Sequence, residues 1–170
     1  MNTDRLRDAR IPAFVFALGL AAILSAWGFQ LIGGYVPCKL CLEQRIPYYV
    51  GLPIALAALG AALAGAPART SRLLLAIAGL VFCVSVYLAT YHAGIEWGWW
   101  AGPADCGAGG AGATLTTDDL ANQLKGIRVV SCSQASFRFL GLSFAGWNAV
   151  VSVVLVAGSF YGVLRGDRDT

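Results

Sequence analysis

Four long apolar stretches, separated by polar segments, dominate the pattern along the chain. They cover residues 12–32, 46–64, 73–95 and 142–164, and none has a charged residue in its interior. Each is close to the roughly 20 apolar residues that a helix needs to cross a bilayer. Because lipid offers the backbone no hydrogen-bonding partners, such runs have to be helical. The pattern predicts an all-α membrane protein, a four-helix transmembrane bundle forming a single domain over residues 1–170.

A cleaved signal peptide is the alternative for the first run, because Arg5, Arg7 and Arg10 precede it. The run is longer than the usual apolar core of a signal peptide, about 7–15 residues, and no clear cleavage motif follows it. We therefore expect an uncleaved first span.

Composition agrees with a membrane protein. The chain is 58% hydrophobic and 12% charged, whereas a soluble domain has about 25% charged residues. Its formal net charge is only +3, and it contains no basic tract. We therefore expect no nucleic-acid partner.

Arginine is concentrated on one side of the predicted membrane. Four spans place both termini and residues 65–72 on the same side, which holds seven arginines: Arg5, Arg7, Arg10, Arg69, Arg72, Arg165 and Arg168. The other side is longer, with residues 33–45 and 96–141, but holds five cations: Lys39, Arg45, Lys125, Arg128 and Arg138. Because cations near span ends mark the cytoplasm, both termini are expected to be cytoplasmic.

This orientation places Cys38, Cys41, Cys106 and Cys132 on the outer face, where disulfides persist. Four cysteines can pair in three ways, and the sequence does not choose among them. Cys83 lies in the middle of the third span and is predicted to be a small buried packing residue.

Cys38 and Cys41 form a C-x-x-C motif at the head of the second span. A disulfide across so short a ring braces little, so redox exchange and zinc binding are the two readings. Zinc would require further ligands, for which His92, Cys106 and Cys132 are the candidates.

Redox chemistry suits the surroundings better, because a helix N-terminus and a nearby cation stabilise a thiolate. Arg45 follows Cys41 by four residues and is predicted to share its helix face. The alternative role for Arg45 is an interfacial anchor that reaches toward lipid phosphate.

The long outer loop, residues 96–141, displays Cys106 on a glycine-rich stretch, while Cys132 lies next to the last span. This pair reads either as a structural staple or as a pair accessible to exchange. Between the two cysteines, residues 116–127 predict a short amphipathic helix with an apolar stripe of Leu120, Leu124 and Ile127. The stripe is expected to rest on the bilayer or on the bundle top.

Three motifs, in order and on four spans, resemble the bacterial disulfide bond formation protein B (DsbB) family over nearly the whole chain. They are PCKLCLEQR before the second span, YHAGIEWGWWAGPADC after the third, and CSQASFRFLGLSFAGWN before the fourth. The resemblance implies a multi-pass protein of the bacterial inner membrane. It also implies an oxidoreductase that reoxidises DsbA, a soluble periplasmic thioredoxin-fold oxidase, and delivers electrons to ubiquinone or menaquinone.

The resemblance also implies a role for each site residue. Cys41 is the cysteine that faces quinone, and Arg45 supports its thiolate. Cys106 forms the mixed disulfide with the partner, and Cys132 resolves it and then engages Cys38. His92 lies near the position of the family's quinone-side histidine. No metal is implied.

Two alternative functions remain on the residues alone. One is a tetraspan structural protein whose outer loop is braced by disulfides, which the C-x-x-C motif argues against because it braces almost nothing. The other is a zinc-binding membrane protein.

Overall fold

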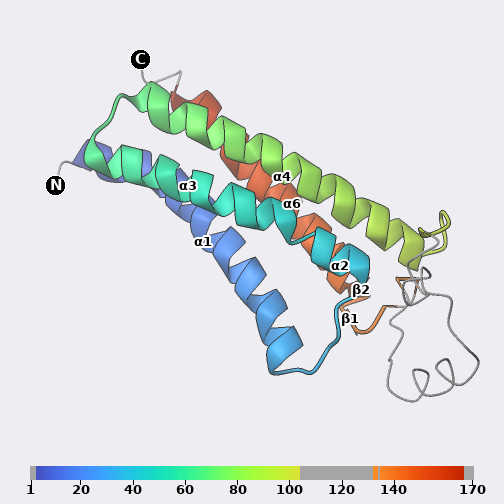
Figure 1. Ribbon diagram of the computed structural model, residues 1–170. Coiled ribbons are helices and arrows are strands. Elements are labelled where there is room, and N and C mark those ends of the chain that lie inside the picture. Colours follow the sequence, from blue (N-terminus) through green and yellow to red (C-terminus); the bar gives the residue numbers. More distant parts are fainter. Residues whose placement is uncertain (1–2, 104–131, 134, 167–170) are drawn as a thin grey trace, which may run out of the picture.

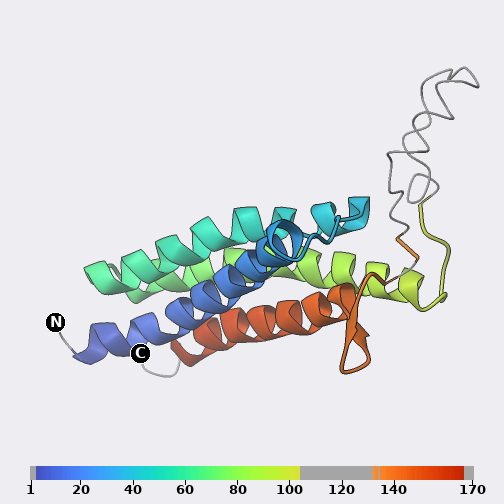
Figure 2. The same ribbon diagram turned by 90° about the horizontal axis from the view of Figure 1, so that it is seen from below.

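Four long helices make up most of the chain in the computed structural model, which describes residues 3–103, 132–133 and 135–166 (Figures 1 and 2). They are α1 (Thr3–Leu31), α3 (Ile46–Ala64), α4 (Ala68–Glu96) and α6 (Phe144–Gly166). All four are long and apolar enough to cross a membrane, α3 together with the short helix α2 (Lys39–Glu43) that precedes it. The predicted four-helix membrane fold is confirmed.

Two of the helices begin well before their apolar runs. α1 starts at Thr3 rather than near residue 12, and α4 starts at Ala68 rather than near residue 73. The arginines that precede the first and third runs therefore lie on helical turns. Their Cα positions are set by the bundle rather than by loops.

The fourth predicted span began two residues too early. Leu142 and Ser143 form strand β2 (Leu142–Ser143), which pairs antiparallel with β1 (Arg138–Phe139). Leu140 and Gly141 connect the strands with φ angles of 51° and 83°. Two successive positive φ angles are the signature of a tight hairpin turn, which hydropathy does not detect.

The helices form a ring in which each packs against its neighbours in the chain, and α6 closes the ring against α1. Within the ring, the apolar core includes Val15, Leu52, Phe82 and Leu155, all of them buried. Because lipid is as apolar as these side chains, close packing rather than hydrophobicity drives such helices together. Gly51 shows this packing, since an added Cβ there would lie 2.8 Å from Cζ of Phe82.

The two ends of the bundle differ. Figures 1 and 2 show both termini at one end, with α2 and the β1–β2 hairpin at the other. Figure 1 also shows α1 diverging from α3 toward the end where α2 lies. The predicted amphipathic helix at residues 116–127 lies outside the described residues and stays a prediction.

Candidate functional site

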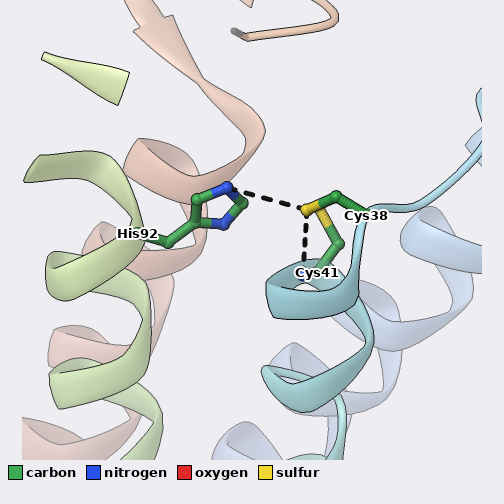
Figure 3. Close-up of side chains that lie close together, drawn as sticks. All are labelled: Cys38, Cys41 and His92. Atoms are coloured by element: carbon green, nitrogen blue, oxygen red, sulfur yellow. Dashed lines mark hydrogen bonds between the residues drawn. The ribbon is translucent and has the colours of Figure 1, made fainter. Parts of the chain in front are cut away.

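Cys38 and Cys41 form a dithiol at the start of α2 (Figure 3). Cys38 is the N-cap residue, and its Sγ accepts a hydrogen bond from the backbone N–H of Cys41 at 3.2 Å. The two sulfurs are free thiols 2.8 Å apart. Only 6% of Cys38 is exposed, and Cys41 is half-buried.

The pKa of the Cys38 thiol is lowered from 9.0 to about 4. The hydrogen bond with the Cys41 side chain is the largest cause, and His92 and the backbone of Cys41 act in the same direction against the cost of burial. A thiolate held by an N-cap hydrogen bond is the expected effect of a helix N-terminus. These contacts therefore favour the thiolate form of Cys38.

α2 ends at Glu43, and a turn at Gln44 and Arg45 joins it to α3. Pro47 explains the break, because proline has no N–H to donate to the carbonyl of Glu43, and its ring would clash with that carbonyl. Gln44 and Arg45 are buried in spite of their polarity. The helix break therefore places two buried polar residues between α2 and α3, shortly after the dithiol in the chain.

His92 projects from α4 toward Cys38, as Figure 3 shows. Its Nε2 lies 3.7 Å from Sγ of Cys38 and 3.9 Å from a carboxylate oxygen of Glu96. His92 is only 3% exposed. The structure thus places His92 beside Cys38, where the sequence had suggested it as a candidate zinc ligand and, through the family resemblance, as a quinone-side histidine.

A chain of buried amides holds His92. The amide nitrogen of Gln44 lies 2.6 Å from Nδ1 of His92, Asn148 donates to the Gln44 carbonyl at 2.7 Å, and Tyr48 donates to the Asn148 carbonyl at 2.6 Å. An amide nitrogen is only a donor, so Nδ1 accepts. A neutral His92 then carries its proton on Nε2, the nitrogen that faces Cys38.

A cavity of about 290 Å³ lies beside the dithiol and is lined by residues of all four long helices. Cys41 lines it, whereas Cys38 does not. Its polar end is formed by Cys41, Gln44, Arg45, His92 and Asn148, and its walls are mainly apolar, including Ala22, Ile23, Phe29, Phe144 and Val151. The two sulfurs therefore differ in what they reach, and Cys41 is the one exposed to the cavity.

The spacing of Arg45 from Cys41 had predicted that the two residues share one helix face, but in the structure the Arg45 side chain has other partners. Its guanidinium donates to the side-chain carbonyl of Gln30 at 2.7 Å and lies 5.4 Å from the ring centroid of Trp27. The reason is the helix break, which places Arg45 at the N-cap of α3 instead of one turn along α2. Arg45 nevertheless lines the cavity, to which it brings a positive charge.

Cys132 lies against the dithiol. It is disulfide-bonded, only 2% exposed, and part of one buried cluster with Cys38, Leu40 and Ile95. Cys106 lies outside the described residues. The structure thus brings three of the four predicted site cysteines to the same end of the bundle.

Cys83 is a free thiol on α4, but it is exposed rather than buried. The prediction of a core packing residue is wrong, because Phe82, which is fully buried, occupies the core-facing position. The Cys83 side chain points away from the bundle at mid-span, where lipid would surround it.

Four further polar residues of this region were not predicted from the sequence: Gln44, Tyr48, Glu96 and Asn148. One signal could have found them, since a polar side chain within or beside an apolar span usually faces the bundle interior and often marks function. Their pairing could not be found that way, because Tyr48 and Asn148 are 100 residues apart in the chain.

The fold and the site define a class, a multi-pass membrane protein with a buried dithiol next to an internal cavity. Comparison with protein families places the chain within that class. Residues 8–162 match the family described as disulfide bond formation protein DsbB. The chain belongs to the DsbB family, whose members act in disulfide bond formation in the bacterial inner membrane.

A curated relative is itself without an assigned function. The chain is 24% identical over 143 residues to the "Uncharacterized protein RP370" of Rickettsia prowazekii (strain Madrid E). The aligned region covers 84% of this chain and 80% of the relative. No solved structure matches.

Proposed function

We propose that the protein reoxidises a periplasmic dithiol oxidase of the DsbA type and passes the electrons to a membrane quinone, either ubiquinone or menaquinone. The observation that carries this proposal is the position of Cys41. Its sulfur lies 2.8 Å from that of Cys38, and its side chain also lines the cavity. Cys41 therefore connects a dithiol to a mainly apolar compartment inside a membrane bundle.

The cavity fits a quinone ring and the start of its apolar tail. Polar groups gather at the end nearest Cys41, and Arg45, Gln44 and Asn148 there offer donors suited to quinone carbonyls. The remaining walls are mainly apolar. A quinone bound there supplies an acceptor for two electrons and two protons.

The route begins outside the membrane. A thiolate of the partner attacks the Cys106–Cys132 disulfide at Cys106, which forms a mixed disulfide and releases Cys132 as a thiolate. The partner's second thiolate then releases Cys106, so that the partner is oxidised and this pair is reduced. Each exchange breaks one S–S bond and forms another.

Transfer to the inner pair follows the same chemistry. Cys132 attacks Cys38 of a Cys38–Cys41 disulfide and frees Cys41 toward the cavity. The low pKa of Cys38 makes it a good leaving group when Cys106 attacks Cys132, because a more acidic thiol leaves faster. That last exchange restores the outer disulfide, leaves two electrons on Cys38 and Cys41, and readies them for oxidation.

In the proposed orientation, the dithiol end is periplasmic and both termini are cytoplasmic. The concentration of arginine at the end with the termini supports this orientation. Tagging the C-terminus with a reporter that is active only in the cytoplasm tests it, and an inactive reporter would reverse the assignment.

Quinone consumption by the purified protein tests the proposed function. With a reduced DsbA-type oxidase as electron donor, wild-type protein should reduce ubiquinone or menaquinone catalytically, and Cys41→Ser and Cys106→Ser should not. Cys83→Ser is the matched control, because it removes a thiol far from the cavity and should keep full turnover. Quinone reduction that survives Cys41→Ser, or wild type without any turnover, would contradict the proposal and favour a braced structural role.

Zinc binding is a second candidate, favoured by one observation. Ligand atoms of Cys38, Cys41 and His92 all lie within 4.8 Å of one another, which supplies three of the four ligands of a structural zinc site. Equilibrium dialysis of reduced protein against zinc tests it. One tightly held zinc per chain, lost in Cys38→Ser, would support a zinc site, whereas no retained zinc would leave the redox role alone.

A further inference from the structure

A second cavity, of about 200 Å³, lies at the end of the bundle that holds both termini. Arginines from three different helices line it: Arg7 and Arg10 of α1, Arg72 of α4 and Arg165 of α6. Asp8 is the one acidic residue in the described lining. The cavity therefore carries a clear excess of positive charge.

Membrane orientation alone does not explain this arrangement. Cations near the cytoplasmic ends of spans are usual, but they need not converge on one space. Arg5 and Arg69, at the same end, do not line the cavity. The guanidinium of Arg5 instead packs against Gly65 at the C-terminus of α3, where an added Cβ would lie 2.6 Å from its Cζ.

The floor of the cavity is apolar and tightly packed. Ile11, Leu75 and Gly162 contribute to it, and Leu75 is only 2% exposed. A Cβ added at Gly162 would lie 2.5 Å from Cδ2 of Leu75 and 2.8 Å from Cγ2 of Ile11. An arginine rim above an apolar floor, where the spans end, matches the boundary between lipid headgroups and acyl chains.

We propose that this cavity binds the phosphate of an anionic phospholipid. Guanidinium groups hold phosphate oxygens with paired, charge-assisted hydrogen bonds, and basic pockets between membrane helices are known sites for anionic headgroups. The positive excess selects a lipid with net negative charge over a zwitterionic one, whose cationic group the arginines would repel. The site is separate from the dithiol and does not rest on the proposed function.

Thermal unfolding of the full chain in a neutral detergent tests the site. Added phosphatidylglycerol should raise the unfolding midpoint in a saturable way, whereas phosphatidylcholine with the same acyl chains, or inorganic phosphate, should not. Arg10→Gln with Arg165→Gln should weaken the apparent lipid affinity by about 25-fold, since each arginine near an anionic lipid surface contributes a factor of about five. Arg69→Gln with Arg138→Gln removes the same charge outside the cavity and should bind lipid like the wild type.

A third pair of substitutions separates the effect of lost charge from an effect on folding. Arg10→Lys with Arg165→Lys keeps both charges and should retain the preference for phosphatidylglycerol. Equal lipid affinity in the two glutamine pairs would overturn the proposal, as would loss of the preference in the lysine pair. An equal effect of phosphatidylcholine would exclude an anionic site. A saturable effect of inorganic phosphate, lost in the cavity pair, would identify a free phosphate site instead of a lipid site.

Discussion

The sulfurs of Cys38 and Cys41 are neighbours in different surroundings. Cys38 caps α2, faces His92 and belongs to the buried cluster that includes Cys132. Cys41 lines the cavity. Under the proposed function, this asymmetry would let Cys38 exchange with the outer pair while Cys41 meets the acceptor in the cavity.

The low pKa of Cys38 predicts an unusual pH dependence of alkylation. In reduced protein, the rate of iodoacetamide labelling at Cys38 should stay nearly constant as pH falls from 9 and drop only near pH 4, where the thiolate is protonated. Peptide mass spectrometry at each pH measures it. Cys41→Ala removes the largest cause of the shift, so its profile should move to higher pH.

The same shift has a consequence for stability. A pKa that is lower in the folded state stabilises the reduced protein fully above the ordinary value of 9.0, and this contribution disappears as pH falls through about 4.

The alkylation experiment can contradict the low pKa of Cys38. A labelling rate at Cys38 that falls tenfold per pH unit from pH 9 downward would show an ordinary thiol instead.

The two single cysteine variants should differ. In Cys38→Ser, Cys41 has no disulfide partner and should meet added quinone as a free thiolate at the cavity, which we expect to give a visible charge-transfer absorbance band. Cys41→Ser should give no band and should accumulate a Cys38–Cys132 disulfide. Absorbance spectra and non-reducing peptide maps of both variants test this difference. A band in Cys41→Ser alone would mean that Cys38, and not Cys41, faces the quinone.

Gln44 is predicted to position His92. Gln44→Leu removes the donor to Nδ1, so the proton of neutral His92 should no longer be confined to Nε2. Nitrogen NMR of labelled histidine reports the tautomer, and turnover should fall roughly tenfold with the lost hydrogen bonds.

Tyr48→Phe is the control for Gln44→Leu. It removes a hydroxyl that is three hydrogen bonds away from His92 and should change the tautomer much less. An unchanged tautomer in Gln44→Leu would remove Gln44 from the site.

At the scale of elements, apolar runs predicted the four helices because each run alone satisfies the length and backbone requirements of a span. The β1–β2 hairpin and the helix break before Pro47 each depend on one or two particular residues. Hydropathy averaged along the chain does not detect such short features. The contact of Gln44 with Asn148 depends on two helices meeting, and no local pattern encodes it.

Helix packing gives a prediction at this scale. Gly51→Ala should destabilise the bundle by about 1–3 kcal/mol, because its Cβ would overlap the Phe82 ring. Gly60→Ala is the matched control, since nothing lies within 4 Å of a Cβ there. Thermal unfolding in detergent compares them, with Phe82→Leu expected to rescue part of the loss. Equal midpoints for the two glycine variants would contradict the packing argument.

At the scale of the whole molecule, the two ends of the bundle differ: one end holds the dithiol, and the other holds most of the arginines. The sequence predicted this polarity, since the positions of cysteine and arginine relative to the spans suffice for it. It did not predict that four arginines line one cavity, and it assigned Cys41 rather than Cys38 to the quinone side only through the family resemblance. Which residues line each cavity depends on how helices approach each other in three dimensions.

The divergence of α1 affects how the proposed acceptor would arrive. Phe29 of α1 lines the cavity and is 45% exposed, so the cavity is open at this helix. Under the proposed function, quinone would enter sideways from the bilayer. The reaction would then respond to the number of quinones per lipid, so adding quinone-free lipid should slow turnover in vesicles, while diluting the suspension with buffer should not.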